Sequence, residues 1–323
     1  MLGGTRFLGP PVVRQLLEAG HEVVLFHRGV HEHPDSAGAV HVHGDFARFG
    51  EHVPELIRRR PELVIDLAPY IDKDGHGVLH FLAGSARAVV TTSQDVYRAF
   101  AFLHGSDPTG RPQPTPLTEE SETRTGPAPE MVPQLDYDNL EVEQALTGEA
   151  APVTVLRLPL IYGPHDPQRR LTYYVRRMYD GRRAILLDER LARFRWSRSY
   201  VENVAAAVVL ASTDHRARGR TYNVAERHTA AWEEWVRDIA DVCGWKGEIV
   251  ALPAERVPMS LHFPVPAGQD LDASSERIRR ELGYSEVTEI GVGLRRAIEW
   301  ERAQQTNEPA PDYSDEDAVL ASL

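Results

Sequence analysis

Short apolar runs separated by helix-like segments dominate the first half of the chain. The runs that predict strands lie at residues 1–2, 22–26, 39–43, 63–68, 88–92 and 153–158. The segments with apolar residues at helical spacing lie at 10–19, 51–59, 76–83 and 137–146. Strands that alternate with helices in this way are typical of a parallel sheet with helices on both faces.

The second half of the chain is predicted to be mainly helical. Its helical segments are 171–180, 200–211, 231–243, 277–282 and 291–302. Trp232, Trp235 and Ile239 fall on one face of their segment, which predicts that they belong to the core. Ser314 is expected to cap a short last helix. The remaining expected features are a strand at 221–224, a hairpin-like stretch at 184–196 and a long irregular loop at 105–134.

A glycine turn lies between the first apolar run and the first helical segment. Gly3 and Gly9 are six residues apart in the order strand, turn, helix, strand, which is typical of a dinucleotide-binding βαβ unit. Glycine lets the backbone approach a pyrophosphate, and the helix amino terminus offers it unpaired N–H groups. The alternative is a glycine turn with an empty site. Arg6 replaces the usual middle glycine, and because only Met1 and Leu2 precede the turn, we expect the native start to lie upstream.

Composition limits the class of protein. The 323 residues are 42% hydrophobic and 26% charged, as in ordinary globular proteins, and the length suits a nucleotide domain with a smaller partner domain. The formal net charge of −12 disfavours nucleic acid or an anionic membrane as a partner. No apolar run reaches membrane-spanning length. The single cysteine, Cys243, excludes an internal disulfide and fits a reducing cytoplasm.

Two candidate cofactor contacts follow the second and third apolar runs. In NAD sites, the residue that accepts hydrogen bonds from the adenosine ribose hydroxyls is usually acidic. In this chain His27 and Arg28 stand at that place, the end of the second run. A cation there would attract a 2′-phosphate, so NADP is favoured over NAD. The alternative is a solvated arginine at a strand end. Asp45 follows the third run and either accepts from the adenine amino group or caps the next helix.

Candidate substrate contacts lie at the end of the fifth run and in an arginine-rich segment at 169–198. Ser93 ends the fifth run, where a hydroxyl would point into the crevice of a parallel sheet; it contacts substrate or caps the strand end. Arg169, Arg170, Arg195 and Arg198 are expected to gather on a cleft wall that faces an anionic substrate, although any single one is more simply a solvated surface residue. We assign no metal ligand.

A series of short motifs extends along nearly the whole chain. In chain order they are GGTRFLG, GHEVVLFHRG, GDF, VIDLA, TTSQDVY, LRLPLIYGP, YVENVAAAVVLA, TYNV and RRELGY…AIEWER. In these motifs the chain resembles the extended or atypical short-chain dehydrogenases/reductases. The closest branch resembles bacterial NAD-dependent epimerase/dehydratase proteins that are also related to chloroplast stem-loop-binding proteins. The resemblance implies an α/β fold, with a Rossmann-type doubly wound parallel sheet and a smaller carboxyl-terminal substrate domain.

The resemblance also implies domains and site residues. The NAD(P)-binding domain would comprise 1–163 and 200–226, the substrate domain 164–199 and 227–305, and an acidic tail 306–323. The residues implied to line the cofactor are Gly3, Thr5, Arg6, Phe7, Gly9, Arg28, Asp45, Phe46, Leu67, Ala68, Pro159 and Ile161. Those expected to contact the substrate are Tyr97, Arg169, Arg195 and Arg198. A homodimer through the helices around Tyr137 and His76 is what the family suggests.

The family's catalytic tyrosine and lysine, spaced YxxxK, are replaced in this chain. Leu135 and Asn139 stand at the two places, and neither Lys73 nor Lys246 is positioned by sequence to replace the lysine. Tyr137 is displaced by two residues, which turns its side chain by about 200° on a helix. Without a nearby cation its pKa should stay near the ordinary value of about 10.

Three functions therefore remain open. The first is an NADP- or NAD-linked oxidoreductase or epimerase for a hydroxylated, perhaps sugar-like anionic small molecule. In it Ser93 orients the substrate, Tyr137 or Asp95 is the acid/base, and Asn139 hydrogen-bonds the nicotinamide ribose. The second is a repurposed enzyme of non-redox elimination or cyclisation. The third is a nucleotide-sensing or partner-binding protein without turnover.

Overall fold

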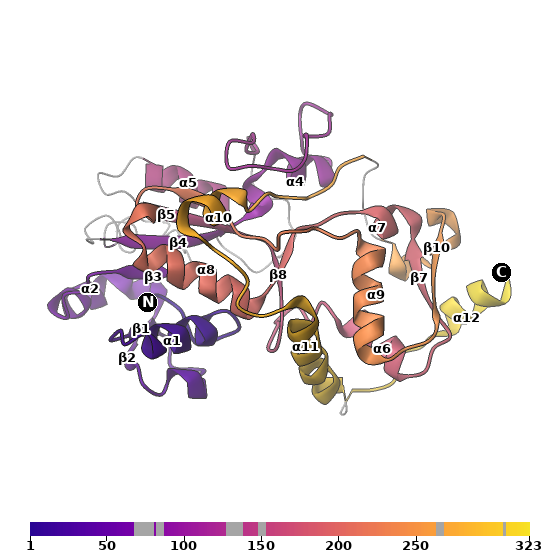
Figure 1. Cartoon of the computed structure of the whole chain (residues 1–323), viewed down its shortest axis with the longest axis horizontal. Coiled ribbons are helices and arrows are strands. Elements are labelled where there is room, and N and C mark those ends of the chain that lie inside the picture. Colours follow the sequence, from indigo (N-terminus) through magenta and orange to yellow (C-terminus); the bar gives the residue numbers. More distant parts are fainter. Residues whose placement is uncertain (68–80, 82–86, 127–137, 148–152, 263–267, 306–307) are drawn as a thin grey trace.

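The computed structural model of the chain describes residues 1–67, 81, 87–126, 138–147, 153–262, 268–305 and 308–323. These residues form two lobes, with the parallel sheet in the larger one and a helical group in the smaller one (Figure 1). Met1 lies within the larger lobe, and the carboxyl terminus lies at the far end of the smaller lobe. None of the helices in these ranges is long and apolar enough to cross a membrane.

The opening residues form the centre of the parallel sheet. Leu2 bridges in parallel to Phe26 on one side and to Asp66 on the other. It thereby joins the pair β1–β2 to the four-stranded order β3–β4–β5–β9. These strands are β1 (Val24–His27), β2 (Val40–His43), β3 (Val64–Asp66), β4 (Ala88–Ser93), β5 (Val153–Leu158) and β9 (Thr221–Asn223). Two backbone hydrogen bonds, Leu2 N to Ile65 O at 2.8 Å and Gly3 N to Phe26 O at 3.1 Å, hold the segment in place.

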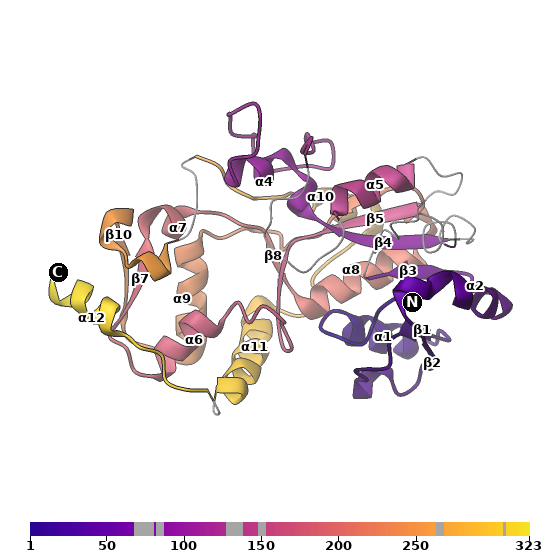
Figure 2. The same cartoon turned by 180° about the vertical axis from the view of Figure 1, so that it is seen from behind.

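Helices cover both faces of this sheet (Figure 2). On one face α1 (Gly9–Glu18) packs against α8 (Val201–Thr213), and α8 also contacts β4 and β5. On the other face lie α2 (Phe49–Arg58) and α5 (Asn139–Thr147). The doubly wound parallel sheet predicted from the sequence is therefore confirmed.

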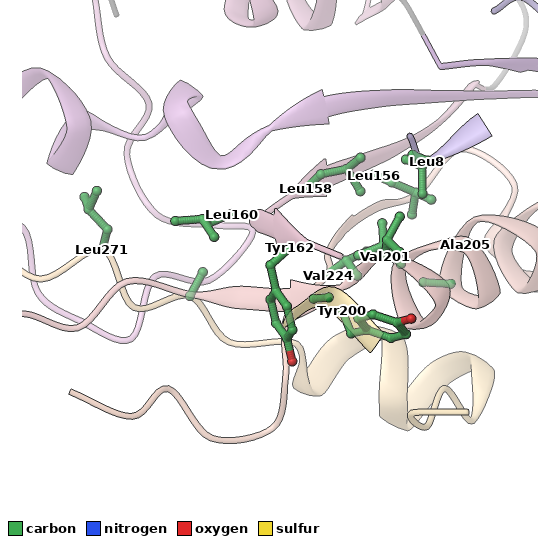
Figure 3. Close-up of a cluster of buried hydrophobic side chains, with 14 of the residues drawn as sticks. Leu8, Leu156, Leu158, Leu160, Tyr162, Tyr200, Val201, Ala205, Val224 and Leu271 are labelled. Carbon is green, nitrogen blue, oxygen red and sulfur yellow. The ribbon is translucent and has the colours of Figure 1, made fainter. Parts of the chain in front are cut away.

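Alternation along the strands divides the core into two layers. Leu25, Val89 and Leu156 join the cluster that contains α1 and α8, whereas the adjacent Phe26 and Val90 join the cluster that contains α2. Figure 3 shows the first layer continuing from Leu8 and Leu156 through Val201 and Tyr200 towards Tyr162 and Leu271. One apolar cluster thus spans both lobes, because the same side chains line the junction between them.

The smaller lobe is built around α9. Its elements are α6 (Thr172–Tyr179), β7 (Ala184–Asp188), α7 (Glu189–Arg193), α9 (Trp232–Cys243), β10 (Glu248–Leu252), α11 (Ile290–Gln305) and α12 (Ser314–Ala321). Trp232, Trp235 and Ile239 of α9 are buried, as predicted. The pair β6 (Leu160–Tyr162) and β8 (Arg198–Tyr200) connects the lobes, and α10 (Glu276–Leu282) returns to pack on β9.

Two local expectations are wrong. Residues 184–196 do not form a hairpin, because β7 pairs in parallel with β10 and is followed by α7. Ser314 does not cap the last helix with its side chain; its backbone N–H instead donates to Asp312 Oδ1 at 2.9 Å. The helix expected at 76–83 falls mostly outside the described residues.

A short helix, α4 (Arg98–Leu103), lies between η3 (Gln94–Val96) and the loop expected at 105–134. The described part of that loop, residues 105–126, contains no helix or strand. The short 3₁₀ turns within the described residues are η1 (Pro34–Ser36), η2 (Phe46–Arg48), η3 (Gln94–Val96), η4 (His215–Ala217), η5 (Ala254–Arg256) and η6 (Met259–Leu261).

Candidate functional site

The glycine turn places the amino end of α1 against the carboxyl edge of the sheet. Gly3 and Gly4 have φ of +80° and +108°, which L side chains rarely adopt. A Cβ at Gly9 would lie 2.3 Å from the backbone of Gly4, so only glycine allows the helix to start this close to the strand. Thr5 and Phe7 are half-buried in this turn. The turn is thus a compact backbone cradle.

Few helix amides remain to face a ligand at this end of α1. Gly9 N donates to Arg6 O at 2.9 Å, and Pro10 and Pro11 have no N–H. The first turn of α1 therefore offers a ligand fewer amides than a helix without prolines would. Arg6 is exposed at the rim.

The ends of β1 and β2 carry the residues expected at the adenosine side. Arg28 follows β1 directly and is exposed. Asp45 accepts from Ala47 N at 3.0 Å and so caps η2, which is the second of the two roles expected for it. Phe46 lies edge-on to Phe26, with the ring centroids 5.2 Å apart. The carboxylate of Asp45 is exposed, so capping leaves it open to solvent.

Ser93 and Asp95 lie together at the carboxyl end of β4. Ser93 Oγ accepts from Asp95 N at 3.1 Å and caps the turn η3. The hydroxyl hydrogen of Ser93 is not used in this contact, so it remains able to donate to a ligand. Both side chains are only partly buried, and the exposed fraction of the Asp95 side chain is 26%.

Asn139, expected from the sequence to stand at the place of the family's lysine, contacts Asp95. Its Nδ2 donates to the two carboxylate oxygens of Asp95 at 2.9 and 3.2 Å. Arg124 approaches the same carboxylate at 4.0 Å and donates from Nε to Asp95 O at 2.9 Å. The guanidinium of Arg124 is chiefly paired with Asp138, which precedes α5. Asn139 therefore holds a carboxylate instead of acting as a cation.

Burial makes the carboxyl group of Asp95 a weaker acid than an ordinary aspartic acid. Desolvation raises the pKa of Asp95 to about 6, against the opposing effects of Arg124 and the hydrogen bond from Asn139. A carboxyl group with this pKa exchanges a proton near neutral pH, as an acid/base catalyst must. Tyr137, the other expected acid/base, lies outside the described residues.

The remaining cofactor residues follow neighbouring strands. Leu67 directly follows β3, and its N–H donates to Leu2 O at 3.1 Å; Ala68 lies outside the described residues. Pro159 and Ile161 are partly buried after β5 and within β6. Because the main sheet is parallel, β3 and β5 end at the same edge as the glycine turn, Ser93 and Asp95.

Tyr97 is not available to a substrate. Its side chain is fully buried, its hydroxyl donates to Asn223 Oδ1 at 2.7 Å, and Arg157 lies over its ring. The structure therefore gives no support to the expectation that it binds substrate. The reason is that η3 turns the chain after Ser93, so Tyr97 points into the core.

The four arginines expected on one cleft wall have separate protein partners. Arg169 pairs with Glu301 and Glu308, and Arg170 pairs with Asp166 at 2.6 Å. Arg195 Nη1 donates to Thr229 O at 2.5 Å. Arg198 is 3% exposed and lies over the ring of Trp235, so it does not face a cleft. The expectation that these arginines gather on one cleft wall to bind an anionic substrate therefore loses its support.

A cavity of about 560 Å³ lies elsewhere. It is lined by residues such as Val23, Val24, Leu63, Val64 and Ser212. Its position at the amino ends of β1 and β3 separates it from Ser93 and Asp95, which lie at the carboxyl edge of the sheet. The cavity is therefore separate from both the glycine turn and the site that contains Ser93 and Asp95.

Sequence reasoning missed Arg124 and Asp138. They form a buried ion pair, and the guanidinium of Arg124 lies 4.0 Å from the carboxylate of Asp95. A single arginine in an irregular region and an aspartate before a helix carry no pattern that could have identified them. Thr92, Glu143 and Arg157 form a second buried network beside this pair.

Comparison with protein families matches residues 1–225 to the family described as the NAD dependent epimerase/dehydratase family. Among curated proteins, the chain is similar to a 2′-dehydrokanamycin reductase of Streptomyces kanamyceticus. The two are 26% identical over 261 residues, which cover 78% of this chain and 68% of the reductase.

Solved structures share the fold. A putative epimerase from Burkholderia cenocepacia superposes with a TM-score of 0.70 at 18% identity, over 94% of this chain and 97% of that one. A UDP-glucose-4-epimerase from Stenotrophomonas maltophila with bound NAD and formylated UDP-arabinopyranose gives 0.69 at 18% identity, over 95% and 98%. A UDP-glucose 4-epimerase from Thermotoga maritima with UDP-glucose gives 0.65 at 16% identity, over 94% and 98%.

Proposed function

Because the chain belongs to the NAD dependent epimerase/dehydratase family, we propose that it interconverts an alcohol and a ketone on a hydroxylated, sugar-like small molecule. A nicotinamide dinucleotide serves as its redox partner. The observation that carries this proposal is Asp95, whose half-buried carboxyl group has a pKa of about 6 and whose backbone N–H donates to the Ser93 hydroxyl in the same turn. This pair replaces the missing tyrosine and lysine.

The residues of the glycine turn fit a dinucleotide. Gly3, Gly4 and Gly9 leave the backbone bare where a Cβ would fill the cradle, and the amino end of α1 carries the positive end of the helix dipole. Since Gly9 N is already engaged, Phe7 and Leu8 amides are the ones that a diphosphate would take. Arg28 at the end of β1 would contact a 2′-phosphate, which favours NADP over NAD.

Proton transfer is the task of this chain's own residues. When bound, the nicotinamide ring accepts or donates a hydride. Ser93 Oγ donates its hydrogen to the substrate oxygen and orients it. In the oxidation direction the carboxylate of Asp95 takes the proton of the substrate hydroxyl, and in the reduction direction its carboxylic acid returns that proton. Asn139 keeps the carboxylate in place through its amide.

The substrate class is supported by the relatives rather than by a charged pocket. The reductase from Streptomyces kanamyceticus is named for a kanamycin derivative, and several structural neighbours hold UDP-sugars. A ring with several hydroxyl groups is common to these molecules. The anionic character expected from the sequence rested on arginines that now have protein partners, so it is not part of the proposal.

The test is turnover of a panel of keto-sugars and their alcohols with NADPH and NADH, followed by the absorbance of the nicotinamide. Asp95→Asn should lower kcat by roughly 10² to 10⁴ and leave nucleotide affinity unchanged, because Asp95 transfers a proton. Ser93→Ala should also lower kcat. Glu141→Gln, an exposed carboxylate on the same helix as Asn139, is the matched control.

Other outcomes identify the other hypotheses. If Tyr137→Phe abolishes turnover and Asp95→Asn does not, the tyrosine is the acid/base and Asp95 is structural. Conversion that requires no nucleotide would contradict the redox proposal and favour elimination or cyclisation. Nucleotide binding without conversion of any panel member would favour a sensing protein.

A further inference from the structure

Three histidines and a glutamate converge at the carboxyl ends of β1 and β2. His27 ends β1, and it pairs in register with His43, which ends β2. His41 lies two residues before His43, so it projects from the same face of the sheet. Glu32 reaches them from the loop after β1. This cluster was not expected from the sequence, and the proposed reaction does not use it.

The ligand atoms of these four side chains are within reach of a single ion. One nitrogen or oxygen from each of His27, Glu32, His41 and His43 lies within 4.8 Å of the others. His43 Nε2 is 3.2 Å from Glu32 Oε1, and His41 Nδ1 is 3.9 Å from the same oxygen. Ligands of a tetrahedral Zn²⁺ lie about 2.0–2.1 Å from the ion, so they are about 3.4 Å from one another. Small side-chain movements therefore complete the site.

A hydrogen bond already orients His41 for binding. Its Nε2 contacts Ser36 O at 3.1 Å and must donate to it, because a carbonyl oxygen only accepts. The proton of His41 is thus on Nε2, and the lone pair of Nδ1 points to His27 Nε2 at 2.7 Å. Ligating histidines in metal sites are held in the same way, with the second nitrogen donating to a carbonyl or carboxylate.

We propose that His27, Glu32, His41 and His43 form a binding site for a divalent transition-metal ion of the Zn²⁺ class. Three imidazoles and one carboxylate are ligands that suit this class and do not suit Ca²⁺ or Mg²⁺, which prefer oxygen atoms. The ion replaces the proton that His27 Nε2 shares with His41 Nδ1. Its binding ties the loop with Glu32 to the ends of both strands, directly beside Arg28.

Binding of an ion requires both His27 and His43 to move a proton between their ring nitrogens. His27 Nδ1 accepts from Gly29 N at 3.1 Å, so Nε2 carries the proton in the absence of an ion. To ligate through Nε2, His27 must move its proton to Nδ1 and release the amide of Gly29. Gly29 is exposed, so the released amide can donate to water. His43 Nε2 lies 3.2 Å from Glu32 Oε1 and donates to it, because a carboxylate only accepts. To ligate through Nε2, His43 must therefore also move its proton to Nδ1, whereas His41 and Glu32 need no change of this kind.

The experiment is a titration of Co²⁺ into the chelator-treated full chain without nucleotide, monitored by the visible d–d absorption of tetrahedral Co²⁺. We expect one Co²⁺ per chain and its displacement by one equivalent of Zn²⁺. His41→Ala should abolish the band, and Glu32→Gln, a change at an exposed side chain, should weaken binding at least about tenfold. His228→Ala, an exposed histidine outside the cluster, should bind as the wild type does.

Two results would overturn the site: no tetrahedral spectrum in the wild-type chain, or a spectrum that both His41→Ala and Glu32→Gln retain. Glu32→Gln covers the case in which His41→Ala does not fold, because its side chain is 55% exposed. The titration contains neither nucleotide nor substrate, so its failure leaves the proposed enzymatic activity standing. Conversely, inactivity towards every keto-sugar leaves the metal site standing.

Discussion

Burial raises the pKa of Asp95, and for this reason the effect of Asp95 on stability depends on pH. Its pKa is about 6 in the folded chain and about 3.9 in an unfolded one, so the folded state binds the extra proton between these values. Stability therefore falls as pH rises through this window, and the penalty is complete above pH 6. Asp95→Asn removes the penalty, and we expect it to gain about 3 kcal/mol over the wild type between pH 4 and 7.

Chemical denaturation at a series of pH values measures this difference. Asp315→Asn, a change of an exposed carboxylate on α12, should leave the pH dependence of the wild type unchanged. A stability difference between wild type and Asp95→Asn that stays constant from pH 4 to 7 would show that the carboxyl group titrates normally.

In the proposed function, Arg28 favours NADP over NAD. Its exposed guanidinium at the end of β1 would make a charge-assisted contact with a 2′-phosphate, which only NADPH carries. Arg28→Ala should weaken NADPH by roughly 10- to 100-fold and NADH much less. Calorimetric titration gives both Kd values, with Arg58→Ala on α2 as the control. An equal loss for both nucleotides would remove the argument for NADP.

Residues at strand ends were predictable from the sequence, and their partners were not. Ser93 and Arg28 follow apolar runs, and the edge at which such runs end is fixed by a parallel sheet. Tyr97 was misplaced because a 3₁₀ turn, which periodicity does not show, directs it into the core. Arg124 and the histidine cluster depend on tertiary contacts between segments that no local pattern connects.

Among the elements, α1 depends most visibly on one residue. Because a Cβ at Gly9 would meet the backbone of Gly4 at 2.3 Å, Gly9→Ala must displace the helix or the strand. We expect a loss of about 1–3 kcal/mol in the free energy of unfolding, together with loss of nucleotide binding. Gly50→Ala in α2, where no atom lies within 4 Å, should be neutral or slightly stabilising.

Thermal unfolding and nucleotide titration of both variants measure the effect. A Gly9→Ala chain that unfolds and binds nucleotide like the wild type would mean that α1 can start elsewhere.

Most elements were predictable because each carries a complete local signal. The strands of the main sheet have apolar or alternating sequences, and α9 has a strong apolar face. The stretch 184–196 failed for a different reason. Its apolar run and polar end suited a hairpin, but the partner strand β10 lies far along the chain, and local sequence does not identify a distant partner.

At the scale of the whole molecule, the acidic end of the chain is attached to the smaller lobe. Glu316 of α12 forms a buried ion pair with Arg177 of α6, and Asp317 pairs with Arg182. Glu316→Gln leaves the guanidinium of Arg177 buried without its carboxylate, which costs about 3–5 kcal/mol in such sites. We expect α12 to detach, with faster hydrogen exchange over residues 314–321.

The matched change is Asp315→Asn, which alters the same helix at an exposed position. It should leave exchange unchanged. Unaltered protection of α12 in the Glu316→Gln chain would mean that apolar contacts of Val319 and Leu320 hold the helix without the ion pair.

The central claim is that a nicotinamide dinucleotide binds at the glycine turn of the native chain. The melting temperature of the chain, measured with and without nucleotide, tests this claim most directly. A ligand that binds only the folded state at about 100 times its Kd stabilises it by about 2.7 kcal/mol. We predict that millimolar NADPH raises the melting temperature, and that NADH raises it less. No change with either nucleotide would contradict the claim.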